Sequence, residues 1–230
     1  MKSKLRKLFE RHDPIMGRAL TSAKSREWLR PSNGDLSLYR PEVLAHDKNF
    51  TQHNLPLKAS AVLVPIVTRG DALSILLTKR SETLKSHSGQ VSFPGGRCDE
   101  DDAHAMATAL REAEEEINLP HNNVEIIGAM EDYETVTGFN VSPVVGFVDP
   151  EFEIKMHVKE VEAVFEVPLE YILDPENHKI ERLMWKGAMR HYYAFPPVER
   201  DKVKYKIWGA TAAMLVRFAN LVNENETRAA

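Results

Sequence analysis

The sequence has very little cysteine and no long apolar run. Cys98 is the only cysteine among 230 residues, which excludes an intramolecular disulfide and a thiolate zinc site and favours a reducing compartment such as the cytoplasm. The longest apolar stretch, residues 61–67, has seven residues, whereas a membrane-spanning helix needs roughly 18. We therefore predict no membrane-spanning segment and no membrane partner.

A strong charge of one sign is also absent. The net charge of −4 gives the whole protein no attraction for nucleic acid, so no nucleic-acid partner is predicted. A hydrophobic share of 43% with 28% charged residues excludes a disordered chain, and 11 glycines are too few for a collagen-like repeat. The length suits one well-buried domain with an appendage.

Residues 1–57 differ from the rest of the chain. Residues 1–30 carry nine Lys and Arg against three Asp and Glu, and residues 2–10 are predicted to form a short helix with Leu5, Leu8 and Phe9 on one side. We expect this segment to be an appendage that packs weakly or against a partner subunit, which leaves a homodimer open, and to be dispensable for chemistry. Its basic start is typical of a solvated surface helix or of an organellar transit peptide.

Residues 58–224 show the pattern of one compact α/β domain, followed by a tail at 225–230. Strands are predicted at residues 61–67, 73–78, 124–133, 141–148, 160–167 and 190–195. Helices are predicted at residues 103–117, 169–173 and 209–222, and a long loop at 79–97. Gly70 suits a hairpin turn between the first two strands. Strands separated by helices, with hairpins among them, predict a mixed β-sheet covered on both faces.

The predicted helix at 103–117 is strongly acidic. Residues 96–119 carry eight Asp and Glu against two Arg. At about 100° per residue, one apolar stripe faces the core and consists of Met106, Leu110, Ala113 and Ile117. Three glutamates share a sector on roughly the opposite side, namely Glu112, Glu115 and Glu116. This segment is the most informative part of the sequence.

Such crowding of carboxylates has a cost, because like charges four residues apart destabilise a helix by roughly 0.2–0.5 kcal/mol. A divalent cation between Glu112 and Glu116 would offset it, since Mg²⁺ takes oxygen ligands together with substrate phosphates. Neither residue has a basic partner three or four positions later, whereas Arg111 can pair with Glu114 or Glu115. The alternative is an ordinary solvated charged face.

Two glycines just before the helix favour the metal site over a solvated face. Gly95 and Gly96 allow the backbone to come close to a ligand and can offer a carbonyl oxygen to a metal.

This segment resembles the Nudix box, G-x5-E-x7-R-E-U-x-E-E-x-G-U with U aliphatic, of hydrolases that split nucleoside diphosphates linked to another moiety. Residues 111–116, Arg-Glu-Ala-Glu-Glu-Glu, match its R-E-U-x-E-E core. Three departures are visible: one extra residue between Gly96 and Arg111, Asp102 in place of the upstream Glu, and Asn118 in place of the late glycine. Asn tolerates the left-handed end of a helix. The resemblance implies a Nudix-type α/β/α sandwich with a mixed β-sheet.

The extra residue is typical of one branch of that superfamily. Residues 76–96 resemble the motif L-L-T-x-R-S-x3-R-x3-G-x3-F-P-G-G of the coenzyme A pyrophosphatases, with Lys85 in place of the second Arg. Lysine keeps the charge but not the bidentate geometry. Asp99 and Asp102 fit the branch's spacing of acidic residues, and the likeness covers about residues 59–222. It implies hydrolysis of coenzyme A or its thioesters to 4′-phosphopantetheine, or its acyl derivative, and adenosine 3′,5′-bisphosphate.

The resemblance also implies roles for residues. Mg²⁺ or Mn²⁺ would be held by Glu112 and Glu116, with Glu115 and the Gly96 carbonyl as further ligands. The catalytic candidates are Arg111, which holds carboxylates in place, Glu115, an alternative general base, and Glu160. An ordinary charge at the start of a strand is the other interpretation of Glu160.

Substrate contacts are predicted on the glycine-containing loop and beyond it. Arg80, Lys85 and His87 suit the 3′-phosphate of coenzyme A, or are solvated loop charges, and Phe139 suits an apolar groove for the pantetheine arm. Other nucleotide substrates, such as ADP-ribose, NADH and capped RNA, remain alternatives. A non-catalytic nucleotide-binding protein of the same fold is a further alternative, although the complete set of glutamates favours an enzyme.

Overall fold

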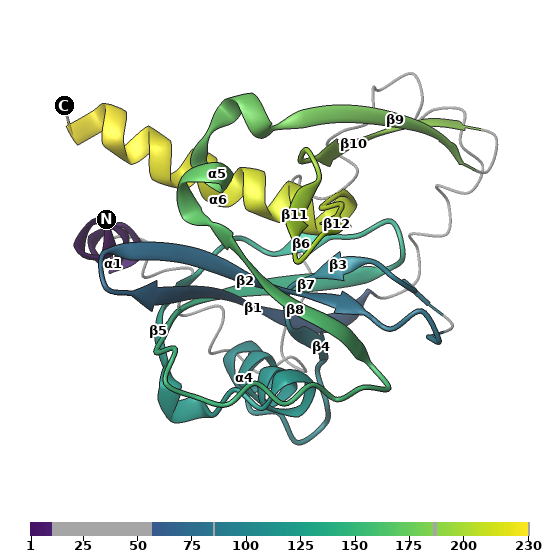
Figure 1. Ribbon diagram of the computed structural model, residues 1–230, viewed down its shortest axis with the longest axis horizontal. Helices are drawn as coiled ribbons and strands as arrows, with labels where there is room; N and C mark the ends of the chain where they lie inside the picture. Colours follow the sequence, from purple (N-terminus) through teal and green to yellow (C-terminus); the bar gives the residue numbers. More distant parts are fainter. Residues whose placement is uncertain (11–56, 85, 186–187, 230) are drawn as a thin grey trace.

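A mixed β-sheet lies at the centre of the computed structural model, which describes residues 1–10, 57–84, 86–185 and 188–229 (Figure 1). Its eight described strands are β1 (Lys58–Arg69), β2 (Ala72–Arg80), β3 (Val91–Ser92), β4 (Gly95–Arg97), β5 (Val124–Ala129), β6 (Tyr133–Glu134), β7 (Phe139–Val148) and β8 (Val161–Pro168). β1 and β7 pair in parallel, whereas the other pairs are antiparallel. β1 and β7 are central because they are the long, nearly continuous apolar strands, which can be buried on both faces.

Helices and two small ribbons complete the described chain. The helices are α1 (Lys2–Glu10), α4 (Ala105–Ile117), α5 (Leu169–Leu173) and α6 (Gly209–Ala229), with short 3₁₀ turns at His121–Asn123 and Pro175–Asn177. One two-stranded ribbon is formed by β9 (Lys179–Trp185) and β10 (Ala188–Ala194), and the other by β11 (Val198–Arg200) and β12 (Val203–Tyr205). None of the described helices is long and apolar enough to cross a membrane.

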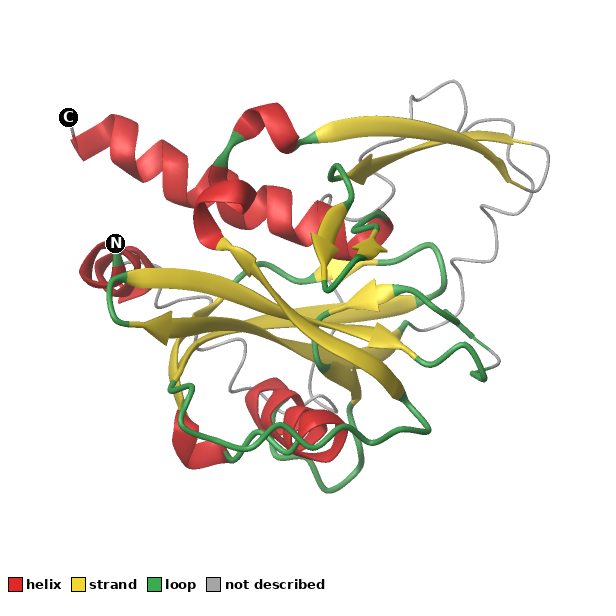
Figure 2. Ribbon diagram, in the orientation of Figure 1, coloured by secondary structure: helices red, strands yellow, loops and turns green. Residues whose placement is uncertain are grey.

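The helices cover both faces of the sheet (Figure 2). α4 packs on one face through a core cluster that includes Leu63 and Val144 of the central strands. The other face is covered by α1, α5 and α6, and the core between them includes Ile66 and Phe218. The predicted α/β/α sandwich with a mixed sheet is confirmed.

The strands and helices depart from the predicted boundaries in several places. The loop expected at 79–97 contains the last residues of β2 together with β3 and β4, and the strand expected at 124–133 is divided between β5 and β6. β9, β11 and β12 were not predicted, and α6 continues beyond residue 222. Short or polar strands escape a search for apolar periodicity, because pairing to a neighbour, not their own composition, defines them.

The predicted hairpin turn and helix end are confirmed. Gly70, between β1 and β2, has a φ of +62°. Asn118 ends α4 at a φ of +60°, and its N–H donates to the carbonyl of Glu114 at 2.8 Å. Both positions need the left-handed conformation that Gly and Asn adopt at low cost.

α1 corrects the expectation of a weakly packed N-terminal segment. The predicted helix is present, but Leu5, Leu8 and Phe9 are buried in the core against α6 and β5. Phe9 also lies against Gly128, where an added Cβ would be 2.7 Å from the ring. Residues 11–56 lie outside the described structure, so the domain boundary at residue 57 stays a prediction.

Replacing Phe9 by Ala is expected to lower the free energy of unfolding by about 3–5 kcal/mol, because it removes a buried ring and leaves a cavity. Chemical denaturation measures this loss, and Lys7→Ala on the exposed side of the same helix is the matched control. Activity per folded molecule is expected to stay unchanged. Equal stability of the Phe9→Ala and wild-type proteins would show that α1 adds nothing to the core.

Candidate active site

Two glycines of β4 pack directly against the acidic helix α4. Gly95 and Gly96 pair with Val62 and Ala61 of β1. A Cβ on Gly95, which has a φ of +155°, would lie 2.5 Å from the carbonyl oxygen of Ala61. A Cβ on Gly96 would lie 2.4 Å from the carboxyl carbon of Glu112. Only glycines therefore let β4 fit between β1 and the carboxylate.

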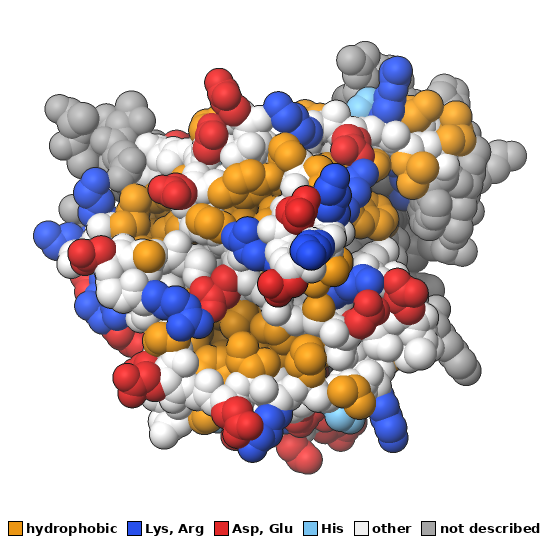
Figure 3. All heavy atoms as spheres, viewed as in Figure 1, with side chains coloured by type: hydrophobic (Ala, Val, Ile, Leu, Met, Phe, Trp, Pro, Cys, Tyr) orange, Lys and Arg blue, Asp and Glu red, His pale blue; other side chains and the backbone are white. Residues whose placement is uncertain are grey.

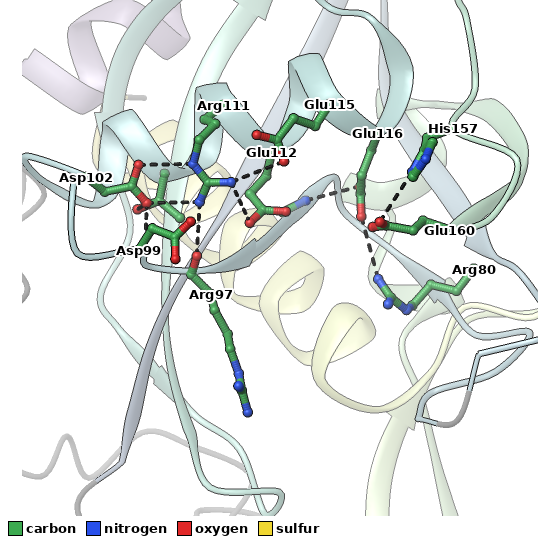
Figure 4. A network of polar contacts seen from close by, with 12 residues as sticks. Arg80, Arg97, Asp99, Asp102, Arg111, Glu112, Glu115, Glu116, His157 and Glu160 are labelled. Atoms are coloured by element: carbon green, nitrogen blue, oxygen red, sulfur yellow. Dashed lines mark hydrogen bonds and ion pairs between the residues drawn. The ribbon is translucent and has the colours of Figure 1, made fainter.

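Glu116 is the most buried of the three helix glutamates. It is 2% exposed, and its carboxylate accepts the Gly95 N–H at 3.3 Å and faces the Arg80 guanidinium at 3.5 Å (Figure 4). Glu112 is half-buried, and the Glu115 side chain is 60% exposed. The prediction that all three face away from the core is wrong for Glu116.

The buried stripe of α4 explains that error. The helix buries Ala105, Ala109, Ala113 and Ile117, whereas Met106 and Leu110 are only partly buried. Small alanines let the helix approach the sheet closely. This rotation of the helix relative to the predicted stripe turns Glu116 inward.

Burial changes the acid–base properties of these carboxylates. The pKa of Glu116 is raised to about 8: burial is the largest cause, Arg80 and the Gly95 N–H oppose the rise, and the nearby charges of Glu112 and Glu160 add to it. Burial also raises the pKa of Glu112, against the effect of the adjacent Arg111. A cation placed here would favour ionisation of both groups.

Arg111 joins the loop to the helix carboxylates. Its Nε and Nη2 donate to the two oxygens of Asp102 at 3.1 and 2.9 Å, and Nη1 donates to Glu112 at 3.0 Å and Glu115 at 3.2 Å. Nη2 also donates to the carbonyl of Arg97, the residue after Gly96, at 3.1 Å. The predicted pair with Glu115 is confirmed, whereas Glu114 contacts His121 instead.

Asp102 stays ionised at the centre of this network. It also accepts the Thr108 hydroxyl at 2.9 Å and the Asp99 N–H at 2.8 Å. Burial acts to raise the pKa of Asp102, but these bonds and those from Arg111 outweigh it and lower the pKa. The same contacts raise the pKa of Arg111. A fixed ion pair therefore orients Glu112 and Glu115.

Glu160 lies at the other end of the carboxylate group. It precedes β8 instead of opening it, and its carbonyl accepts the Ser81 N–H at 2.8 Å. Its carboxylate faces His157 Nδ1 at 3.3 Å and lies beside the Arg80–Glu116 pair in Figure 4. The Glu160 side chain is 43% exposed, so water reaches it.

The structure does not bring the predicted substrate residues together. Lys85 lies outside the described residues. His87 is exposed and contacts Gln90 at 2.9 Å, whereas Arg80 points to Glu116. Phe139, at the start of β7, has the guanidinium of Arg97 and the ammonium of Lys58 over its ring at 5.4 and 5.8 Å.

Comparison with known proteins decides the family of this chain. Residues 57–193 match the NUDIX domain model. The chain belongs to the Nudix family. It is a Nudix hydrolase, an enzyme that cleaves pyrophosphate bonds in nucleoside diphosphate derivatives. The match includes β4 and α4, the two elements that carry the carboxylate site described above.

Similar sequences agree with the family. A relative from Cronobacter sakazakii, named an uncharacterised Nudix hydrolase NudL, is 37% identical over 81% of this chain and 91% of its own length. A relative of the same name from Escherichia coli K12 is 39% identical over 79% and 88%. These two relatives are therefore similar to this Nudix hydrolase over most of both chains.

Solved structures give only partial likenesses. The Ap4A hydrolase of C. elegans, solved as a binary complex, is 18% identical, with a TM-score of 0.42 over 50% of this chain and 82% of its own. The NUDIX domain of Shewanella oneidensis NrtR, solved with ADP-ribose, is also 18% identical, with a TM-score of 0.40 over 59% and 87%. The family membership rests on the sequence.

Nudix hydrolases generally use divalent metal ions, and the residues of this chain fit one. Among the described residues, no group of three or more His, Cys, Asp and Glu side chains is arranged to hold a metal ion as it stands. Glu112 and Glu116 are instead paired with Arg111 and Arg80. The donors are nevertheless hard oxygens, the charges of Glu112 and Glu160 raise the pKa of Glu116, and Gly96 leaves room for close approach.

Two contacts of this Nudix site were not predicted from the sequence. The Asp102–Arg111 pair links a loop to a helix across nine positions, so no helical spacing reveals it. The Arg80–Glu116 pair joins β2 to α4 through two residues that are 36 positions apart in the sequence. For the Asp102–Arg111 pair, the sequence signal was that Asp102 replaces the upstream Glu of the Nudix box. No sequence signal pointed to the Arg80–Glu116 pair.

Replacing Asp102 by Asn is expected to lower kcat by about 10- to 100-fold, the usual effect of removing a group that orients metal ligands. Arg111 would lose its bidentate partner and no longer fix Glu112 and Glu115. Steady-state kinetics measure the loss, and Asp101→Asn on the exposed side of the same loop is the matched control. Wild-type turnover in Asp102→Asn would contradict the orienting role.

Proposed function

We propose that this Nudix hydrolase cleaves the diphosphate of coenzyme A or its thioesters, with Mg²⁺ or Mn²⁺. The products are 4′-phosphopantetheine, or its acyl derivative, and adenosine 3′,5′-bisphosphate. The observation that carries the proposal is the motif at residues 76–96, which resembles that of coenzyme A pyrophosphatases and ends in the two glycines beneath Glu112 and Glu116.

The proposed metal ligands are Glu112, Glu116 and the Gly96 carbonyl, with Glu115 as a further donor. A divalent cation at these groups supplies charge neutralisation for the diphosphate and lowers the pKa of the attacking water. Arg111 contributes by fixing Glu112 and Glu115 against the β4 backbone. It is a positioning residue.

We propose Glu160 as the general base. It is open to water, and its charge acts on both Glu112 and Glu116, so it lies close to the cation ligands. From there its carboxylate can take the proton of a water aimed at the diphosphate. Glu115 is the second candidate, although its bond to Arg111 restrains it.

Selection of coenzyme A needs positive charge for its 3′-phosphate and apolar surface for its arm. Lys85 and His87 remain the proposed sources of charge for the 3′-phosphate, and Phe139 remains the proposed apolar contact, whereas Arg80 points to Glu116. Arg97 and Lys58 over the Phe139 ring add a second source, which supports an adenosine 3′-phosphate bound on that side.

A substrate panel tests this function. The purified protein is incubated with Mg²⁺ or Mn²⁺ and coenzyme A, dephospho-coenzyme A, ADP-ribose, NADH or capped RNA, and the products are separated by chromatography. A lost charge-assisted contact to phosphate costs about 1.5–3 kcal/mol, so dephospho-coenzyme A is expected to have a kcat/KM roughly 10- to 150-fold lower.

Arginine variants locate the selectivity. Arg97→Ala is expected to narrow the difference in kcat/KM between coenzyme A and dephospho-coenzyme A, whereas Arg80→Ala is expected to lower both values alike. Faster cleavage of ADP-ribose or NADH than of coenzyme A would refute the substrate but keep the Nudix chemistry. Binding of nucleotides without hydrolysis would support the non-catalytic alternative.

We propose a cytoplasmic location for the enzyme. A cleaved transit peptide would not supply core residues, so the burial of Leu5, Leu8 and Phe9 supports this location over an organelle. Lys and Arg side chains are interspersed with Asp and Glu side chains on the face shown in Figure 3. A homodimer remains an alternative, which size-exclusion chromatography with light scattering tests.

A further inference from the structure

Arg80 provides the one described ion pair between a basic side chain and the buried Glu116. Its Nη1 lies 3.5 Å from Glu116 Oε1, and the Arg80 side chain is 26% exposed. Glu112 and Glu160 act on Glu116 as like charges. Arg80 thus supplies positive charge at the point where three carboxylates converge, which is the charge that a bound cation would supply.

The backbone holds Arg80 at this position. The register between β2 and β8 shifts between Lys79 and Arg80, and the Arg80 N–H donates to the Gln90 carbonyl at 2.9 Å. Lys79 pairs with Ala163 and Arg80 with Val161, so the extra residue at this irregularity is Glu162 of β8. Lys79, the preceding residue, points instead to Glu162 and Glu82. Because successive side chains of a strand point to opposite faces, Arg80 is directed to Glu116 while Lys79 is directed away from it.

We propose that Arg80 is a built-in counter-ion that competes with the divalent cation for Glu116, and that cation binding releases it toward the diphosphate of the substrate. The inference rests on the proposed metal site at Glu112 and Glu116, but not on coenzyme A as the substrate. Glu116 cannot keep Arg80 and accept a divalent cation with the same carboxylate oxygen. The guanidinium, once free, suits a phosphate oxygen pair.

Two consequences follow from this competition. Removing the Arg80 charge should tighten metal binding in the absence of substrate. In the wild type, the metal and a diphosphate ligand should strengthen each other's binding, because the metal frees an arginine for the diphosphate and linkage is reciprocal. Without Arg80 this part of the coupling should disappear.

The first experiment measures Mg²⁺ affinity without substrate, by calorimetry and by the rise in Tm during a Mg²⁺ titration. It is done at alkaline pH so that Glu116 is ionised in each protein. Arg80→Gln is expected to bind Mg²⁺ about tenfold more tightly than the wild type, the effect of removing one competing charge-assisted contact. Arg80→Lys, which keeps the charge, should stay near the wild type.

The matched control is Arg69→Gln, which breaks the Arg69–Glu166 pair at the opposite end of β1 and β2 and should leave Mg²⁺ affinity unchanged. If Arg80→Gln does not fold, Arg80→Met keeps the apolar stem and replaces it. Wild-type or weaker Mg²⁺ affinity in the folded charge-free variant would overturn the proposal. An equal gain in Arg80→Lys would also overturn it, because charge would then not be what competes.

The second experiment measures the coupling with adenosine 5′-(α,β-methylene)diphosphate, which is not hydrolysed at that bond. Mg²⁺ is expected to tighten its binding more in the wild type than in Arg80→Gln, and equal tightening in both would overturn the release step. Neither experiment uses coenzyme A. Failure of coenzyme A hydrolysis with the predicted Mg²⁺ shifts would therefore refute the substrate and leave the role of Arg80 standing.

Discussion

Replacing Glu116 by Gln is expected to lower kcat/KM by at least about three orders of magnitude. The carboxylate is one of two proposed principal ligands of the cation, and loss of several kcal/mol of charge stabilisation at the diphosphate corresponds to this factor. Gln keeps the size of the side chain, and its amide still accepts the Gly95 N–H. The fold is therefore expected to stay intact.

Although Glu116→Gln lowers activity, it should make the folded protein more stable than the wild type at neutral and alkaline pH. Burial raises the pKa of Glu116 from 4.5 to about 8, so folding favours the protonated carboxyl. Such a group stabilises the folded protein fully at a pH below its unfolded pKa, and this contribution is lost as the pH rises through the folded pKa. With a chelator present, the free energy of unfolding of the wild type should decrease as the pH rises from about 4.5 to about 8. Glu116→Gln should not show this decrease.

Glu114→Gln is the matched control for both measurements. Glu114 lies on the same helix but is exposed and contacts only the exposed His121 among the described ion pairs. Its substitution is expected to change stability by no more than about 0.5 kcal/mol and to leave turnover unchanged. Unchanged turnover in Glu116→Gln, measured beside this control, would refute its assignment as a metal ligand.

The fold could be predicted because local sequence patterns indicate its central strands and α4. β1 and β7 are long apolar runs, and α4 has a helical spacing of apolar residues with an Asn that suits its left-handed end. The resemblance to the Nudix box then located the glycines and the glutamates. The match to the NUDIX domain confirms the predicted superfamily, whereas the roles of these glycines and glutamates stay a prediction.

The orientation of the site could not be predicted in the same way. A helical wheel assigns charged residues to the solvent side, yet Glu116 is buried because alanines, not the larger Met106 and Leu110, face the sheet. Its partner Arg80 comes from β2, and the partner of Arg111 comes from a loop. Contacts between distant segments depend on the packed structure, and a single sequence does not record them.

Replacing the two glycines of β4 by Ala is expected to have different effects, namely a loss of stability at Gly95 and a loss of activity at Gly96. At Gly95 the new Cβ would lie 2.5 Å from the Ala61 carbonyl oxygen and 2.6 Å from the Val62 Cα, which are backbone atoms of a central strand and cannot move aside. The φ of +155° adds strain. We expect Gly95→Ala to lower the free energy of unfolding by about 3 kcal/mol or more, as measured by chemical denaturation.

Gly70→Ala separates the cost of backbone strain from the cost of the close contact between the added Cβ and β1. Gly70 also has a positive φ, +62°, but an added Cβ there would meet no atom within 4 Å. Its cost is the backbone strain alone, roughly 1 kcal/mol. If Gly95→Ala costs no more than Gly70→Ala, the close packing of β4 on β1 is not what requires a glycine at position 95.

Gly96→Ala should instead remove activity and leave the fold. The atoms that its Cβ would meet, at 2.4 to 2.5 Å, belong to the Glu112 carboxylate, the mobile end of a long side chain. Glu112 can turn away, but only by leaving Arg111 and the proposed metal position. A displacement of about 1 Å at a reacting centre can cost 100-fold, so kcat is expected to fall by about that factor or more while Tm changes little. A large fall in Tm without loss of kcat in the folded fraction would show that Gly96 serves β4 packing and not the placement of Glu112.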